Sequence, residues 1–134
     1  MNVLPSKVFN DYFEEFIGFI VSIFPEDVDI LSIQTTIPVI RKNNPKLLMK
    51  KWNEYVAQKY ASEISDGNIG FFLCKDYRED IEKFDNADKI LEVIDRIRNP
   101  IRNMNDENLK TIIIYLKNMN KICMSLNDKN KVLW

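Results

Sequence analysis

The sequence contains no histidine, so it lacks the side chain that proteins use most often as a general base and as a metal ligand. Catalytic arrangements that pair a histidine with a serine or a cysteine are therefore excluded. The two cysteines are too few for a zinc site built from thiolates alone. Three glycines are few for a phosphate-binding loop, and neither nucleotide-binding glycine motif occurs in the chain. We therefore expect no catalytic residues, no metal site and no cofactor.

Carboxylates are the one remaining option for acid–base chemistry. Two groups of acidic residues have helical spacing, which places their side chains on one face of a helix. A catalytic role would require a cleft that shifts their pKa values, whereas both groups lie in polar stretches typical of solvent-exposed surface. We interpret them as surface residues: Asp11, Glu14 and Glu15 in one group, and Asp76, Glu79 and Asp80 in the other.

The two cysteines, Cys74 and Cys123, have no neighbouring cysteine and lie in apolar stretches with helical spacing. Buried, reduced thiols are the favoured interpretation, which predicts a protein of the reducing cytoplasm. The most apolar stretch, residues 16–24, is preceded by acidic residues rather than by the basic run of a signal peptide. It is also far shorter than the roughly 20 residues that cross a bilayer. We therefore expect no membrane contact.

Composition and apolar spacing predict a single all-α domain. Hydrophobic residues make up 46% of the 134 residues and charged residues 29%, enough for one core and one surface. Apolar residues recur at intervals of three and four, the period of an amphipathic helix. The expected fold is a compact bundle of about five helices over residues 1–134, with residues 127–134 as a loose tail. The predicted helices cover about residues 7–24, 27–42, 45–64, 86–99 and 105–126, with a short apolar segment and a charged connector between residues 68 and 85.

Prolines and a glycine are expected to interrupt this pattern. Pro38 removes a backbone hydrogen bond from the second helix and should kink it, and the β-branched run of residues 33–40 would also tolerate a strand. Pro100 is expected to end the fourth helix. Gly67 is the expected left-handed terminator of the third helix, and Asn105 is the expected cap of the fifth.

The first predicted helix is apolar around most of its circumference. One face carries the phenylalanines and isoleucines that repeat every three or four residues between residues 9 and 24, and Tyr12, Phe19 and Ile23 form a second strip. Such a helix either lies in the centre of the domain or is half covered by another chain. Tyr12, Phe19 and Ile23, together with C-terminal Trp134, are therefore candidate residues of a protein–protein interface.

Charge is arranged in blocks, although the net charge is only −1. Residues 1–40 sum to −5, residues 41–59 to +5, residues 60–95 to −6 and residues 96–134 to +5. The second block contains a basic corner at which two predicted helices meet, an outline similar to a helix-turn-helix. Its residues are candidates for contact with nucleic acid: Arg41, Lys42, Lys46, Lys50 and Lys51. The same residues would also suit an ordinary solvated surface.

Several landmarks along the chain occur in a familiar order. They are Phe24-Pro25 with Asp27 and Asp29, Arg41-Lys42-x-Asn44-Pro45-Lys46, Trp52-Asn53-x-Tyr55 with Tyr60, Gly67-Asn68-x-x-Phe71-Phe72, Lys75-Asp76-Tyr77, and Asn103-Met104-x-x-Glu107-Asn108. This order resembles a family of small uncharacterised helical proteins of nucleocytoplasmic large DNA viruses of the mimivirus and chlorovirus kind, over about residues 9–126. The resemblance implies a viral protein of the host-cell cytoplasm, with packaging in the virion as a further expectation, and it brings no activity with it.

The function predicted from these observations is that of a non-enzymatic viral interaction protein, a virion or assembly component that acts through protein–protein contacts and self-association. The alternative is a small nucleic-acid-binding protein that uses the basic corner of residues 41–51. An exposed apolar patch would favour the first. A continuous basic surface that joins the corner to Arg96, Arg98 and Arg102 would favour the second.

Overall fold

The computed structural model describes residues 4–130 of the chain, with side chains to residue 125, and every regular element within residues 4–130 is a helix. The all-α prediction is confirmed, but there are about eight helices rather than five. α8 extends into the predicted tail, and residues 131–134 lie outside the described part of the chain. The elements are α1 (Pro5–Ile23), α2 (Val28–Asn43), α3 (Leu47–Trp52), a π-helical turn η1 (Asn53–Ala57), α4 (Ala61–Ser65), α5 (Ile69–Cys74), α6 (Arg78–Ile81), α7 (Ala87–Arg102) and α8 (Asp106–Asn130).

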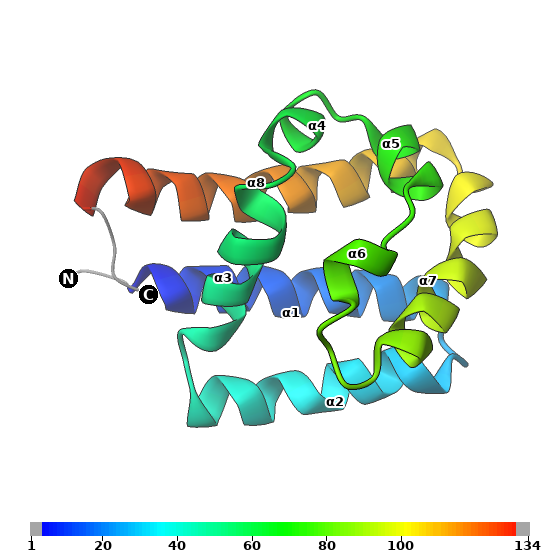
Figure 1. Ribbon diagram of the computed structural model, residues 1–134, viewed down its shortest axis with the longest axis horizontal. Helices are drawn as coiled ribbons and strands as arrows, with labels where there is room; N and C mark the ends of the chain where they lie inside the picture. The colour runs from blue at the N-terminus through cyan, green and yellow to red at the C-terminus, as the bar shows by residue number, and fades with distance from the viewer. Residues whose placement is uncertain (1–3, 131–134) are drawn as a thin grey trace.

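Helix α1 runs through the centre of the molecule (Figure 1). It lies between α2 on one side and α8 on the other, and α3 crosses its N-terminal half. Of the two arrangements that an all-round apolar helix allows, the structure shows the central one. The apolar circumference of α1 is therefore covered largely by helices of its own chain.

The most deeply buried side chains lie where α1, α3 and α8 meet. Phe9, Met49 and Met119 are almost completely buried there. The Trp52 ring packs on Phe9 with centroids 6.0 Å apart, and its indole Nε1 donates to Oδ1 of buried Asn120 at 2.7 Å. Because a buried indole N–H without an acceptor is costly, this bond helps to set the position of α3 against α8.

Polar side chains and one glycine cap three of the helix ends. The Asp27 carboxylate caps α2 by accepting from two backbone amides of its first turn at 3.1 and 3.2 Å. Asn105 caps α8 by accepting from the Asn108 amide at 2.8 Å, as predicted. Gly67 has φ 69°, which confirms the left-handed conformation predicted for it.

The third predicted helix, residues 45–64, is not continuous. It divides into α3, η1 and α4, and the backbone leaves helical geometry at Tyr60, where φ is −120°. Tyr60 is buried, its ring contacts Phe71 and Phe72 of α5, and its hydroxyl donates to Asp80. These contacts with later residues outweigh the helical preference of the segment. The apolar segment and the charged connector that follow also form helices, α5 and α6. The structure therefore has more helices than the five predicted.

Both α2 and α7 continue past an internal proline. α2 continues through Pro38 to its end, so the helical interpretation of this segment is correct and the strand is not. α7 continues through Pro100, so the prediction that this proline ends the helix is wrong. The carbonyls that lose their backbone donor belong to exposed residues, Gln34 and Arg96, where water can replace the missing donor.

The two cysteines differ in burial. Cys123 is buried as predicted, and burial raises the pKa of its thiol to about 12, so the thiol stays protonated. Cys74 is exposed, which corrects the expectation of two buried thiols. It ends the short helix α5, whose inward positions are taken by Phe72 and Leu73. Across residues 4–130, no helix is both long and apolar enough to cross a membrane.

Candidate functional site

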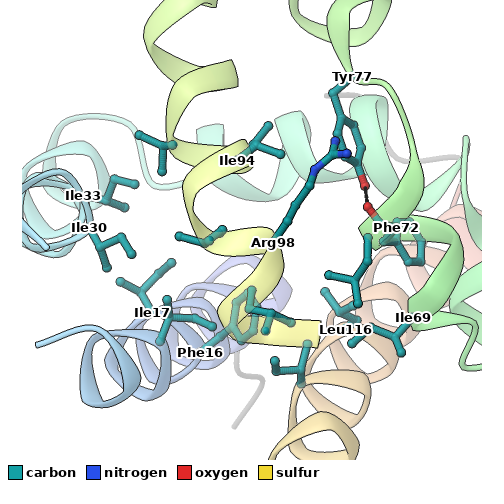
Figure 2. Close-up of a pocket in the computed structure, with 16 residues that line it drawn as sticks. Phe16, Ile17, Ile30, Ile33, Ile69, Phe72, Tyr77, Ile94, Arg98 and Leu116 are labelled. Carbon is teal, nitrogen blue, oxygen red and sulfur yellow. Dashed lines mark hydrogen bonds between the residues drawn. The ribbon is translucent and has the colours of Figure 1, made fainter. Parts of the chain in front are cut away.

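An apolar cavity of about 340 Å³ lies between α7 and the helices α1, α2, α5 and α8 (Figure 2). Isoleucine dominates its walls, and only two lining side chains carry polar groups, Tyr77 and Arg98. The other lining residues are Phe16, Ile17 and Ile20 of α1, Ile30 and Ile33 of α2, Ile69, Phe72 and Leu73 of α5, Val93, Ile94, Ile97 and Ile101 of α7, and Ile112 and Leu116 of α8.

Helix α7 forms one wall of this cavity and has no buried residue of its own. Its apolar positions face inward, yet its closest packing is against α5 and α6 rather than α1 or α2. Arg96 anchors it to the start of α2, where Nε donates to Asp27 at 2.9 Å and Nη2 donates to Asp29 at 3.0 Å. In the last turn, Arg102 Nη2 donates to the backbone carbonyl of Leu73 at 3.2 Å. Arginine contacts therefore hold the C-terminal half of α7, and the apolar side chains of the helix face the cavity.

The two polar residues of the cavity form one of its walls. The Arg98 guanidinium carbon lies 5.6 Å from the centre of the Tyr77 ring, and Arg98 Nη2 donates to the carbonyl of Lys75. The Tyr77 hydroxyl donates to the Phe72 carbonyl at 2.8 Å, as Figure 2 shows. Burial raises the pKa of Tyr77 to about 12, which keeps the phenol protonated as a donor.

The Nε atom of Arg98 is buried and has no hydrogen-bond partner among the described residues. The nearby Asp95 carboxylate oxygen is 3.7 Å away, beyond hydrogen-bond distance. Asp95 belongs to a second, polar hollow of about 220 Å³, which Tyr77 and Arg98 also line. The guanidinium therefore separates an apolar cavity from a polar hollow.

The outward face of α2 is a second notable surface. No charged residue occurs from residue 30 to residue 40, although most of this run is exposed. Ile33 is 43% exposed and Val39 57%, large fractions for apolar side chains. A hollow of about 280 Å³ between α1, α2 and α3 adjoins this face and shares Ile33 with the cavity under α7. We call this surface the α2 outer face, made of the exposed residues Val28, Ser32, Ile33, Gln34, Thr35, Thr36, Pro38 and Val39.

The predicted interface residues of α1 lie mostly inside the fold. Tyr12 packs against the buried core, and the Phe19 ring centre is 6.1 Å from that of Tyr115 in α8. Ile23 is half-buried at the end of α1, and Trp134 lies outside the described residues. Sequence reasoning placed its candidate interface on α1 and did not single out the α2 outer face. The lack of charge over residues 30–40 was the signal that could have found it.

The basic corner is divided between internal ion pairs and free lysines. Arg41 bridges to α1, with Nη2 2.7 Å from Asp11 and Nη1 2.9 Å from Glu14. Hydrogen bonds to Glu14 and Asp11 raise the pKa of Arg41, although burial acts in the opposite direction. Lys51 lies 4.0 Å from Glu54. Among the described residues, the side chains of the three remaining members, Lys42, Lys46 and Lys50, form no hydrogen bond or ion pair, and all three residues are exposed.

The three arginines of α7 do not extend the basic corner. Arg96 is paired with the start of α2, whereas Arg41 lies in the last turn of that helix, at its opposite end. Arg98 and Arg102 donate to backbone carbonyls between residues 73 and 75. A continuous basic surface that joins all these residues is therefore not formed.

The acidic groups also take part in internal contacts. Asp80 is largely buried rather than solvent-exposed, which corrects its interpretation as a surface residue. Burial alone would raise the pKa of its carboxyl, but hydrogen bonds from Lys59 and Tyr60 lower the pKa below the ordinary value. In the part of the chain that the structure describes, no three acidic or cysteine side chains are grouped so that they could hold a metal ion.

Comparison with known proteins gives no relative from which a function could be transferred. No family model, no curated protein and no solved structure matches this chain. The function is therefore argued from the geometry of the two surfaces, the cavity under α7 and the α2 outer face.

Proposed function

We propose that this protein is a non-enzymatic interaction protein that self-associates through the α2 outer face. The observation that carries the proposal is the exposed, uncharged run of residues 30–40 in a chain of which 29% is charged. Depletion of charge at the centre is what distinguishes protein interfaces from ordinary surface. The hydroxyls of Thr35 and Thr36 already donate to the Ser32 carbonyl, so covering them would leave no unpaired donor on either side chain.

A second copy of the chain fits this face because the charges at its two ends are opposite. Exposed Glu26 lies at the acidic start of α2, and exposed Lys42 and Lys46 lie at its end. A twofold axis near Thr35 would place two α2 helices antiparallel, with the acidic start of each helix beside the basic end of the other. Such an isologous contact joins the uncharged centres and pairs the ends.

The wider setting of this function rests on the sequence resemblance. We propose that the protein is a component of a large DNA virus, which acts in assembly in the host-cell cytoplasm or as part of the virion. The order of the landmarks between residues 9 and 126 supports this proposal. Detection of the protein in purified virions by mass spectrometry would support the virion role, and its confinement to infected-cell cytoplasm would support the assembly role.

Self-association is tested by light scattering coupled to size exclusion, over a range of protein concentrations. Val39→Glu places a charge within the α2 outer face and is expected to give a monomer. Ile114→Glu on α8 is the matched control, because Ile114 and Val39 are both 57% exposed. We expect the wild type and Ile114→Glu to be dimers. A wild type that stays monomeric at every concentration would refute the proposal.

The antiparallel orientation has its own test. Glu26→Lys is expected to weaken the dimer, because it places a positive charge beside the basic end of the partner helix. Adding Lys42→Glu and Lys46→Glu to that variant restores opposite charges and is expected to restore the dimer. If the triple variant dimerises no better than Glu26→Lys alone, the two helices do not meet in this orientation.

Nucleic-acid binding is the second candidate function, and the free lysines at positions 42, 46 and 50 favour it. It is tested by gel shift at low salt with the wild type and with the three lysines changed to glutamine. Binding through phosphate contacts should be lost in the variant and should fall steeply as salt rises. Absence of a shift at low salt would remove this candidate.

A further inference from the structure

A shallow groove runs along one face of α8, beside α4 and the left-handed turn at Gly67. Two hollows of about 410 and 300 Å³ form this groove, and Lys117 lines both of them. The α8 residues that line the hollows recur every three or four positions from residue 106 to residue 124. They therefore form one continuous stripe along α8, roughly 27 Å long. We call this surface the α8 groove.

Apolar and basic side chains share the α8 groove. Ile114 is 57% exposed and Met124 43%, which are large fractions for apolar side chains. Three lysines of α8, Lys110, Lys117 and Lys121, line the same hollows. Among the described residues, the side chains of these lysines form no hydrogen bond or ion pair. The groove therefore combines uncovered apolar surface with uncompensated positive charge.

Lys117 lies where the two hollows meet. Its Nζ is 3.9 Å from the position that a Cβ would take at Gly67, so the ammonium lies between α8 and the turn that follows α4. Other cations that lie between helices of this molecule are paired, as Arg41 is with Asp11 and Arg96 with Asp27. Lys117 is half-buried in a similar position without an anion. An anionic group from outside the chain would supply the missing partner.

The lining of the α8 groove also narrows the kind of partner. An added β-strand needs an exposed sheet edge, whereas every regular element within residues 4–130 is a helix. A proline-rich segment needs an aromatic groove, and no aromatic side chain of the described residues lines this one. A helix docked in a groove presents side chains at every third or fourth position, which is also the spacing of the α8 stripe.

We propose that the α8 groove binds an acidic amphipathic helix of a separate protein. Apolar side chains of that helix fill the two hollows, and its carboxylates pair with the three lysines. Nucleic acid or an anionic membrane would meet the lysines but leave the hollows unfilled. Because α1 separates α8 from α2, this groove is distinct from the α2 outer face (Figure 1), and its occupation does not depend on self-association.

The first test measures the binding of designed peptides by fluorescence anisotropy. The probe is a helical peptide of about 18 residues, the length of the groove, with leucines at every third or fourth position and glutamates beside them. One control peptide has lysines in place of the glutamates, and another has the same composition in scrambled order. We expect the probe to bind at least about tenfold more tightly than either control and to weaken as salt rises.

Equal affinity of the three peptides, or no binding of the probe, would overturn the proposal. Vesicles of phosphatidylserine provide the comparison with a membrane. Wild-type protein that binds these vesicles and not the probe would overturn the proposal in favour of a lipid surface.

Charge reversal locates the peptide in the groove. Lys117→Glu is expected to weaken binding of the acidic probe at least about tenfold and to tighten binding of the lysine peptide, a gain that only a folded variant can show. Lys83→Glu is the matched control, because it makes the same change of charge at an exposed lysine outside the groove. If Lys83→Glu weakens the probe as much as Lys117→Glu, the attraction is not specific to the groove and the proposal fails.

A pair of variants separates this groove from the α2 outer face. Ile114→Glu is expected to remain a dimer and to bind the probe at least about tenfold more weakly. Val39→Glu is expected to be monomeric and to bind the probe as the wild type does. A monomeric Ile114→Glu would show that a second copy of the chain occupies the α8 groove, and would overturn the proposal of a separate partner.

Discussion

At the scale of single residues, the indole of Trp52 depends on one acceptor, Oδ1 of Asn120, at 2.7 Å. Asn120→Leu leaves the indole N–H without a partner and is expected to lower the free energy of unfolding by about 1–3 kcal/mol. Adding Trp52→Phe removes the orphaned donor, so the double variant should lose less than the sum of the single variants. The measurement is urea unfolding followed by circular dichroism. Asn118→Leu, half-buried on the same helix, is the control and should cost less than Asn120→Leu.

A second prediction at this scale concerns pH. Hydrogen bonds from Arg96 hold the pKa of the Asp27 carboxyl below its ordinary value of 3.8, although burial acts in the opposite direction. A lowered pKa in the folded state means that the carboxylate stabilises the fold above pH 3.8, and that this contribution is lost as pH falls through the folded pKa. Asp27→Asn should therefore lower the free energy of unfolding, measured by urea denaturation, at pH 7. At pH 2 the same substitution should change it little. A cost that is the same at both values, or an equal pH dependence for Glu26→Gln, would contradict this assignment.

Residue-scale features differ in how far the sequence predicts them. The caps at Asn105 and Gly67 are local, because each depends on backbone within a few residues, and both were predicted correctly. Asp27 and Arg96, which form an ion pair, are 69 residues apart in the sequence. Trp52 and Asn120, which share a hydrogen bond, are 68 residues apart. Such pairs depend on how helices pack, which one sequence does not reveal.

At the scale of elements, two glycines should respond oppositely to the same substitution. Gly67 has φ 69°, so Gly67→Ala forces an unfavourable backbone and is expected to cost about 1 kcal/mol, although an added Cβ would lie 3.6 Å from its nearest neighbour, without a clash. Gly18 lies inside α1, and nothing within 4 Å would contact an added Cβ. Gly18→Ala is therefore expected to stabilise the protein by about 0.5–1 kcal/mol. Thermal unfolding of the two variants measures both effects, and shifts of the same sign would contradict the assigned backbone geometry.

The long amphipathic helices were predictable because the apolar period belongs to the helix itself. Their boundaries fall within a few residues of the prediction at α1, α2 and α8. The third helix was not predictable, because Tyr60 bends the chain toward residues of α5 and α6 that periodicity cannot place. The α2 outer face shows the same limit. Its lack of charge is visible in the sequence, but its exposure depends on the side of α2 that α1 covers.

At the scale of the whole molecule, part of the charge in the alternating blocks forms ion pairs within the chain. The basic second block meets the acidic first block where Arg41 contacts Asp11 and Glu14. The basic fourth block meets the same acidic block where Arg96 contacts Asp27. The uncharged face of α2 takes no part in these ion pairs, and its lack of charge is the reason for proposing self-association ahead of nucleic-acid binding. The viral origin remains a prediction from sequence landmarks.

The distribution of packing also predicts where the molecule opens most readily. α8 contributes Met119 and Cys123 to the fully buried core, whereas α7 has no buried residue and faces the cavity. Local opening of α7 exposes little additional apolar surface and breaks mainly the arginine contacts of its C-terminal half, so its free energy of opening should be small. In hydrogen exchange followed by mass spectrometry, we expect the amides of α7 to exchange at least about tenfold faster than those of residues 112–123 of α8.

The cavity-filling variant Ile94→Trp provides the control for this exchange experiment. If the cavity is the cause, the variant should slow exchange in α7 and leave α8 unchanged, because the indole adds contacts along the apolar wall. Arg96→Ala should act in the opposite direction by releasing α7 from the start of α2. Equal protection of α7 and α8 in the wild type would show instead that the molecule opens as one cooperative unit, with α7 packed as firmly as the core.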